Sequence, residues 1–463
     1  MTGWTLILRS LRFHARAHLG VVLGATVGSA ALVGALVGGD SVRESLRELA
    51  LARLGRVETA MASNDRFFRA ELAGQPGRSG EIPKPAAVLE LPGTAATEDA
   101  AARANHVQVL GVNSSFWHLA ELPPSLTDIP TDAVVLNEPL AAQLKAKIGD
   151  TILLRVQKPS LLSRDAPLTP QEDSSVALRL KLVSVVSDPQ FGRFSLQANQ
   201  IPPLNAFVNL AVLQDKSGQK DRANLLLIPE IAREGKRREQ TEEMQTRMWP
   251  DALFIPAKPY KDDSLAEAAN DGLRGSWQLA DAQLEVREVP GVGALELRSD
   301  RVFLDPPVVE AARKVATNAQ PILTYFVNEL RAGTNATPYS MVTAMGAPIV
   351  PAEMRDDEIL INQWLADDLQ AKPGDALRLT YFVIGNGRAL EERQGEFHIR
   401  GILPLSGAAA DRTLMPEFPG LSKAESSRDW DAGFPIQLNK IRDKDEKYWQ
   451  QHRGTPKAFV TLA

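Results

Sequence analysis

The chain opens with a hydrophobic pattern that differs from everything after it. Residues 19–39 (LGVVLGATVGSAALVGALVGG) carry no charge, whereas the rest of the chain mixes short apolar segments with charged and polar residues. Twenty-one residues in a helix extend about 30 Å, the thickness of the hydrocarbon core of a bilayer. The pattern therefore predicts a transmembrane helix over residues 19–39.

The segment before this run predicts the orientation of the helix. Residues 1–18 carry Arg9, Arg12 and Arg16 between apolar residues at helical spacing, which is typical of an amphipathic helix on a membrane surface. Because Lys and Arg concentrate on cytoplasmic flanks, we expect the N-terminus in the cytoplasm and the bulk of the chain outside the inner (cytoplasmic) membrane. The alternative is a cleaved signal peptide, but the run exceeds the usual signal core of about 7 to 15 residues.

Small residues inside the predicted span indicate that it packs against other helices. Gly20, Gly24 and Gly28 form two consecutive G-x-x-x-G steps on one helical face. Such spacing lets two helix backbones approach closely in lipid. We predict helix packing at these three glycines; the alternative is that small residues are simply common in membrane helices.

Residues 40–55 are predicted to form a stalk helix between the span and the outer region. Ser41 and Glu44 match the S-x-x-E capping box that marks a helix start, and Gly55 is a typical stop. Gly38 and Gly39 allow a break between span and stalk. A continuous helix of about 36 residues is the alternative.

An internal repeat organises the region beyond the stalk. Residues 132–156 (DAVVLNEPLAAQLKAKIGDTILLRV) and 357–381 (DEILINQWLADDLQAKPGDALRLTY) are identical at ten of twenty-five positions without a gap. Each copy predicts a strand, a short amphipathic helix and a Gly-Asp turn into another strand. The turns contain Gly149-Asp150 and Gly374-Asp375, and a backbone role explains both residue types.

Further pairs of similar segments follow in the same order along the chain: 63–68 with 299–303, 107–111 with 342–346, and 206–211 with 458–463. We therefore predict module 1 at residues 56–229, a linker or insertion at 230–283, and module 2 at 284–463. Segments 284–289 and 294–297 flank a Pro-Gly turn and predict a hairpin. The sequence ends on the last strand of the second copy, which indicates a fragment. The expected fold class is α+β, with a membrane helix, a stalk and two related mixed α/β modules.

Composition and motifs narrow the function. A net charge of −5 and a pI near 5.8 argue against a nucleic-acid surface, and the absence of Cys leaves packing to supply stability. No phosphate loop, nucleophile elbow or metal-binding helix motif occurs in the sequence. The acidic pairs Asp356-Asp357 and Asp367-Asp368 are interpreted as solvated surface, because adjacent residues on a helix or strand point in different directions. We predict no catalytic residues, no cofactor and no metal.

Several stretches together resemble a known family. LRSLRFHARAHLGVVLG, GDSVRESLRELALARLG, VQVLGV and the block that contains VVLNEPLAAQL and IGDTILLRV are similar to the MacB/FtsX-like permeases of ABC transporters. The similar part comprises the first transmembrane helix and the MacB-like periplasmic core domain. The resemblance implies a permease dimer with four membrane helices per subunit, driven by an ABC ATPase whose motion reaches the outside through the stalk.

The resulting hypothesis is the N-terminal part of a permease subunit, which couples ATP hydrolysis by a partner ATPase to export or mechanotransmission. The expected partners are that ATPase, a second permease as homo- or heterodimer, and a periplasmic partner or cargo. Two departures from the family stand out: the other three membrane helices are absent, and the core is present twice. The alternative is a membrane-anchored sensor or scaffold that binds a peptide or envelope protein without transport.

Overall fold

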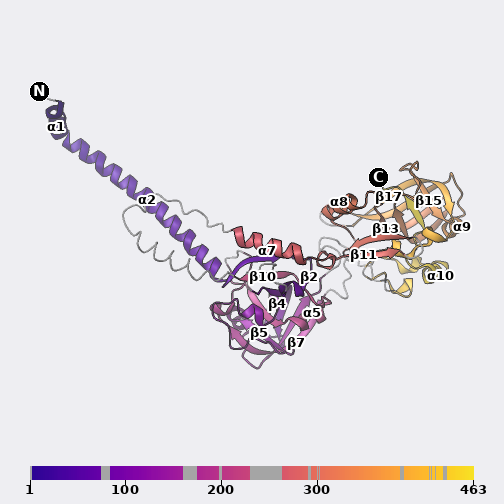
Figure 1. Ribbon diagram of the computed structural model, residues 1–463, viewed down its shortest axis with the longest axis horizontal. Coiled ribbons are helices and arrows are strands. Elements are labelled where there is room, and N and C mark those ends of the chain that lie inside the picture. Colours follow the sequence, from indigo (N-terminus) through magenta and orange to yellow (C-terminus); the bar gives the residue numbers. More distant parts are fainter. Residues whose placement is uncertain are drawn as a thin grey trace.

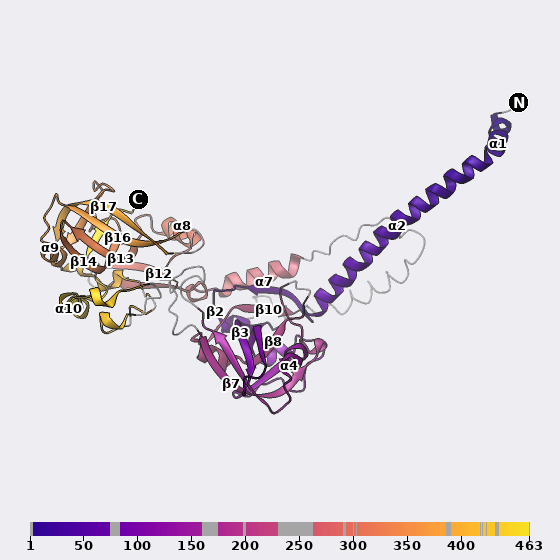
Figure 2. The same cartoon turned by 180° about the vertical axis from the view of Figure 1, so that it is seen from behind.

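The computed structural model describes residues 3–74, 84–159, 175–197, 201–229, 263–289, 293–299, 301, 303–385, 390–416, 418, 420–422, 424–430 and 435–462. A long N-terminal helix, α2, leaves module 1 as a rod, and module 2 lies on the other side of module 1 (Figure 1). The view from behind shows the same order (Figure 2). The predicted α+β class, with one apolar N-terminal helix and two related modules, is confirmed.

The N-terminal region consists of α1 (Gly3–Phe13) and α2 (Ala15–Ala52), separated at His14. Among the described residues, α2 is the helix long and apolar enough to cross a membrane. Its 38 residues are continuous through Gly38 and Gly39, so the continuous alternative is the correct one. The predicted capping box is wrong, because Ser41 lies in the interior of α2, where no helix begins.

Module 1 contains a six-stranded barrel with two extra strands along one edge. The barrel order is β3-β4-β8-β5-β7-β6, closed by a pairing of β3 with β6, and β10 and β1 continue the sheet from β3. The barrel strands are β3 (Ala86–Thr97), β4 (Arg103–Val112), β5 (Ala133–Asn137), β6 (Thr151–Gln157), β7 (Ser175–Val186) and β8 (Leu204–Asn209). The other elements are β1 (Val57–Ala62), β2 (Phe68–Arg69), η1 (Ala70–Gly74), α3 (Ser114–Trp117), α4 (Glu138–Leu144), η2 (Asp188–Gln190), α5 (Leu210–Ser217), β9 (Arg222–Ala223) and β10 (Leu225–Pro229).

Module 2 repeats the same barrel strand for strand. Its closed order is β13-β14-β18-β15-β17-β16, and each neighbouring pair has the same parallel or antiparallel sense as its counterpart in module 1. A register shift interrupts β5 between Val134 and Val135 and β15 at the equivalent Ile359 and Leu360. The strands are β13 (Leu323–Ala332), β14 (Asn335–Ala344), β15 (Glu358–Asn362), β16 (Ala376–Ile384), β17 (Leu390–Leu403) and β18 (Ala458–Val460).

The strand–helix–turn unit predicted from the repeat is confirmed in both copies. Asn137 and Asn362 cap α4 and α9 (Gln363–Leu369) by accepting the backbone N–H three residues later, at 3.2 and 2.8 Å. The following turn needs a positive φ, which is +103° at Gly149 and +93° at Gly374. Shared local chemistry therefore produces the shared backbone.

Each barrel is filled by the apolar residues that the repeat aligns. Leu140 and Leu144 of α4 pack into the module 1 interior, and Leu365 and Leu369 of α9 do so in module 2. All four side chains are buried. The helix therefore closes one end of each barrel with the same two leucines, and burial of such side chains is the main stabilising contribution.

The two modules are connected by α7 (Asp263–Ser276), η3 (Leu279–Ala282), the β11–β12 hairpin (Leu284–Val289 and Ala294–Ser299) and α8 (Pro306–Val315). The predicted hairpin is confirmed. Of the predicted linker, residues 230–262 lie outside the described residues. The remainder is helical and packs on module 1 through Leu273, while Arg69 contacts Asp281 at 2.8 Å.

Candidate functional site

The connection between the last two barrel strands distinguishes the two modules. In module 1, residues 187–203 join β7 to β8, whereas in module 2 the much longer segment 404–457 joins β17 to β18. We call residues 404–457 the insertion. It contains η5 (Gly407–Ala410), η6 (Arg412–Leu414), η7 (Ser427–Asp429), η8 (Leu438–Lys440) and α10 (Asp443–His452).

Aromatic residues attach the insertion to the outside of the module 2 barrel. Phe326 and Tyr339 of the barrel stack with ring centroids 5.8 Å apart. Trp430 and Trp449 of the insertion meet edge to face at 4.9 Å, and Trp430 also contacts both barrel rings. Pairs in these geometries stabilise beyond the area they bury. The insertion is therefore an integral layer of module 2.

A small cavity of about 30 Å³ lies between the barrel and the insertion. Its walls are mostly apolar and aromatic, with Met341, Trp430 and Trp449 among them, but Lys457 and His452 also line it. A space of this size admits one or two water-sized species. Any substrate the size of a metabolite is excluded from it.

Lys457 is the most unusual residue of this site. It is the last residue of the insertion, directly before β18, and is 4 % exposed; its Nζ lies 4.4 Å from the ring centre of Trp364 and 4.8 Å from that of Tyr448. The two rings offer their negative faces to the ammonium group. Burial nevertheless lowers the pKa of Lys457 to about 8, because the charged form loses its hydration.

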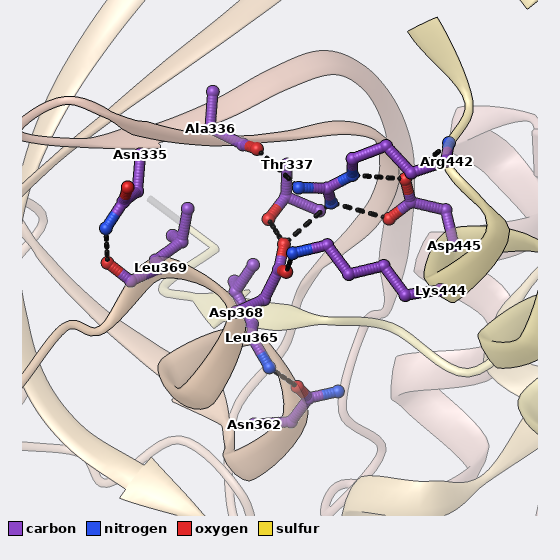
Figure 3. Close-up of polar contacts among 10 residues, drawn as sticks. All are labelled: Asn335, Ala336, Thr337, Asn362, Leu365, Asp368, Leu369, Arg442, Lys444 and Asp445. Atoms are coloured by element: carbon purple, nitrogen blue, oxygen red, sulfur yellow. Dashed lines mark hydrogen bonds and ion pairs between the residues drawn. The ribbon is translucent and has the colours of Figure 1, made fainter.

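Four charged residues act on this lysine, namely Asp368, Arg442, Lys444 and Asp445. Figure 3 shows the ion pairs and hydrogen bonds among these four. Arg442 forms ion pairs with Asp445 and Asp368, each at 2.7 Å, and donates to the carbonyl of Ala336 at 3.0 Å. Lys444 also contacts Asp368. The network thus joins α9 of the repeat to the first turn of α10 in the insertion.

Asp368 is the centre of the network, which corrects the sequence interpretation. The side chain of Asp368 is only 3 % exposed and accepts a hydrogen bond from Thr337 at 2.5 Å. Burial raises the pKa of this carboxyl, but the hydrogen bonds from Lys444, Thr337 and Arg442 outweigh burial and hold the pKa below its ordinary value. Asp367 points elsewhere and is exposed. The interpretation as solvated surface is therefore right for Asp367 and wrong for Asp368.

Asn362 connects the helix cap to the site. Besides capping α9, its side-chain amide donates to the Tyr448 hydroxyl at 3.0 Å and to the carbonyl of Pro456 at 3.2 Å. The Tyr448 hydroxyl in turn donates to the carbonyl of Thr455 at 3.3 Å. Burial raises the pKa of Tyr448, so the phenol stays protonated. A residue conserved between the copies for backbone reasons thus also positions one ring of the lysine cage.

The predicted packing glycines lie far from this site. Gly20, Gly24 and Gly28 are exposed on α2, and apart from the adjacent backbone of α2 itself no described residue lies within 4 Å of the position that a Cβ would take on any of them. Their role in helix packing stays a prediction. Within the described ranges no group of His, Asp and Glu has metal-binding geometry.

Sequence reasoning missed Lys457, Trp364 and Trp430. A signal for two of them was present in the repeat, because Lys457 aligns with Asn205 and Trp364 with Pro139. A lysine at the head of a segment that matches a buried strand at five of its six following positions is a candidate buried charge. Trp430 lies in the insertion, for which the repeat provides no counterpart.

A second functional feature is the junction between α2 and module 1. After α2 the chain turns at Gly55, whose φ is +53°, and a Cβ there would lie 2.6 Å from the Leu119 carbonyl oxygen and 2.7 Å from the Phe191 ring. The Arg56 N–H donates to the same carbonyl at 2.8 Å, and Arg53 donates to the Gln197 carbonyl at 2.9 Å. The helix end is therefore held tightly against the module.

Comparison with known proteins gives only partial likenesses. No protein-family model matches the chain, and no curated protein matches it. The chain is similar to the periplasmic region of MacB from Actinobacillus actinomycetemcomitans, with 11% identity and a TM-score of 0.27, over 42% of this chain and 84% of that one. It is also similar to the extracellular domain of the noncanonic ABC-type transporter YknZ from Gram-positive bacteria, with 12% identity and a TM-score of 0.24, over 40% and 95% of the two chains. TM-scores this low do not establish a shared function.

Proposed function

We propose that this chain is the N-terminal part of a permease subunit of the MacB/FtsX type, which couples ATP hydrolysis by a partner ATPase to movement of the extracytoplasmic modules. The observation that carries the proposal is the continuous helix α2, which joins an apolar membrane-length segment directly to module 1. The resemblance of the N-terminal and repeat segments to such permeases supports the same function.

The dimensions of α2 suit transmission of motion. Thirty-eight helical residues extend about 57 Å, so that roughly half of the helix fits the bilayer and the remainder reaches beyond it. The outer half carries ion pairs one turn apart, Asp40 with Arg43 and Glu44 with Arg47, at 3.7 and 3.4 Å. An unbroken hydrogen-bonded helix passes both rotation and axial displacement along its length.

The far end of α2 delivers this motion to the barrel. Beyond Gly55 the chain enters β1, which pairs with β10, and β10 pairs with β3 of the barrel. A displacement of the helix therefore acts on the edge of the module 1 sheet through backbone hydrogen bonds. The close packing at Gly55 leaves little room for slack at the junction.

The proposal is tested with the full-length gene product and an ABC ATPase encoded beside it, both reconstituted in nanodiscs. Residues 1–463 contain no Cys, so that Lys216→Cys on the exposed end of α5, with any Cys of the remaining segments replaced by Ser, gives one spin label per subunit. We expect trapping with ATP and vanadate to change the label-to-label distance between two subunits. Failure of the two proteins to co-purify, or a label-to-label distance that is the same with and without ATP, would instead favour the anchored sensor or scaffold.

A matched pair of insertions then tests the rod itself. A short Gly-Ser insertion between Arg47 and Glu48, both exposed on α2, interrupts the helix, whereas a two-turn Ala-rich helical insertion at the same place keeps it intact. We expect the flexible insertion to abolish the ATP-dependent distance change and the helical insertion to retain it. Equal behaviour of the two variants would show that α2 does not transmit the motion.

A further inference from the structure

The charges around Lys457 do not balance. Four charged groups act on its pKa: the carboxylates of Asp445 and Asp368, and the cations of Arg442 and Lys444. Both carboxylates already accept from Arg442, and Asp368 accepts from Lys444 as well. With Lys457 the cluster holds three cations and two carboxylates. The backbone of Lys457 is hydrogen-bonded to Met341 and Asn362, but in the described part of the chain its ammonium group has no ion pair or hydrogen bond and contacts only the rings of Trp364 and Tyr448.

The cavity beside Lys457 collects other hydrogen-bond donors that lack acceptors. Trp430 lines it, and its indole N–H is buried without a hydrogen-bond partner among the described residues. Ser340, a third lining residue, has a buried hydroxyl that is likewise unpaired in the described ranges. Most buried polar groups in proteins are paired. Unpaired donors around one cavity, next to an excess positive charge, indicate an occupant that accepts hydrogen bonds and carries negative charge.

The size of the cavity defines the class of this occupant. About 30 Å³ admits a monatomic ion or one to two waters but no phosphate, sulfate or carboxylate-bearing metabolite. Water would satisfy the donors and leave the charge excess in place. Asp445 also lines the cavity, but its two carboxylate oxygens are engaged by Arg442. Apolar walls strengthen attraction between Lys457 and an anion, because little solvent screens them.

We propose that this cavity is a halide site, which binds chloride between the Lys457 ammonium group and the Trp430 indole N–H. The bound ion neutralises the excess charge at the contact between the insertion and the barrel. Halide concentration would then set how firmly the insertion is held on module 2. The equivalent position in module 1 is Asn205, a neutral residue whose amide donates to the carbonyls of Phe194 and Gly192 at 2.9 and 3.3 Å, so that this position supplies no cation for an anion there.

Thermal unfolding of the full chain in detergent tests the site. We expect the Tm to be about 2–4 °C higher in sodium chloride than in sodium gluconate of equal ionic strength, since gluconate is too large for the cavity. Lys457→Met should abolish this difference. Lys372→Met, which removes an exposed lysine of the same module, should leave it unchanged and serves as the control.

A second variant and a direct binding measurement keep the test decisive if Lys457→Met fails to fold. Trp430→Phe removes the N–H donor but keeps an aromatic ring against the barrel, and it should weaken binding about tenfold. Line broadening of the chloride NMR signal by the protein, reversed by added bromide, reports binding directly. Equal Tm values in both salts without line broadening, or a chloride effect that survives Lys457→Met, would overturn the proposal and leave water alone in the cavity.

Discussion

The two barrels have the same strand order but differ in what lies against them. Module 1 crosses from β7 to β8 through a short segment that places Phe191 and Phe194 in an aromatic cluster with Phe116. Module 2 crosses from β17 to β18 through the insertion, with a cavity and a charge network at the contact. The same barrel thus supports a contact made by aromatic rings and neutral amide hydrogen bonds in module 1, and a contact that includes buried charges in module 2.

The difference is concentrated at a few aligned positions. Gln143, Pro139 and Asn205 of module 1 correspond to Asp368, Trp364 and Lys457 of module 2. Asp368 and Trp364 contact the insertion at Arg442 and Tyr448, and Lys457 is the last residue of the insertion. Positions that hold the backbone, such as Asn137 and Asn362, are the same. The two copies therefore share the residues that cap the helix and shape the barrel backbone, and they differ at positions in or next to the insertion.

The largest expected effect tests the backbone structure that both barrels share, which Asn137 holds in module 1 and Asn362 holds in module 2. Asn137→Ala removes hydrogen bonds to the backbone of Leu140, Asn205, Gly192 and Pro203, at 2.7–3.2 Å, and of these groups the Gly192 carbonyl keeps a donor in the Asn205 amide. We expect a loss of about 4 kcal/mol in the stability of module 1. Amide hydrogen exchange of the full chain, read in peptides of β5, measures it.

The equivalent substitution in module 2 is the matched control. Asn362→Ala should cost a similar amount, read in peptides of β15, because it removes the same cap and two further buried bonds. Each variant should leave the other module unchanged. A frame held by different residues in the two copies would show up as a large loss from one substitution and a small loss from the other.

The next effect concerns the lysine found only in module 2. Folding lowers the pKa of Lys457 from 10.5 to about 8, so that the unfolded chain holds a proton that the folded chain has released between these values. Stability therefore rises as pH increases from about 8 to about 10.5, by up to about 3 kcal/mol. Urea unfolding followed by tryptophan emission, in halide-free buffer, measures this rise.

Lys457→Met isolates the contribution of this one group. The variant should lack the rise between pH 8 and 10.5, while the Lys372→Met control should keep it. The three proteins differ only at Lys457 and Lys372, so that a change of the curve seen with Lys457→Met and not with Lys372→Met is assigned to Lys457 and its contacts. Parallel curves for the wild type and Lys457→Met would mean that the folded protein leaves this amine as basic as in water.

Much of the frame could be predicted from the sequence because local chemistry determines it. The apolar run before Asp40 predicts a long helix by length alone, and the repeat predicts strand, capped helix and Gly-Asp turn in both copies. The predicted start of the stalk helix at Ser41 is wrong, because the Ser-x-x-Glu pattern lies inside a continuous helix and marks no helix start there. A capping box acts where backbone N–H groups are free, and those of Ser41 and its neighbours are not.

The site was beyond local patterns because its members come from distant parts of the chain. Asp368 and Arg442 are brought together by the closure of the barrel and the return of the insertion, which no short-range periodicity records. The predicted solvation of Asp368 failed for this reason. The barrel order itself also depends on non-local pairings such as β13 with β16. The positions at which the two aligned copies differ are the best sequence-based indication of the site, because they include Asp368, Trp364 and Lys457.

The smallest of the three effects compares aligned positions directly. Asp368→Ala leaves the guanidinium of Arg442, whose side chain is 33% exposed, with one carboxylate instead of two, and we expect a loss of about 2 kcal/mol in module 2. Gln143→Ala, at the equivalent place in module 1, removes an exposed side chain with one long hydrogen bond of 3.4 Å and should cost less than about 0.5 kcal/mol. Hydrogen exchange in α9 and α4 measures the two losses. Asp368→Asn keeps the shape and a carbonyl acceptor for Thr337, so that it should recover part of the stability. If Asp368→Ala were as mild as Gln143→Ala, the network would be a surface feature, and the insertion would be held by its aromatic residues alone.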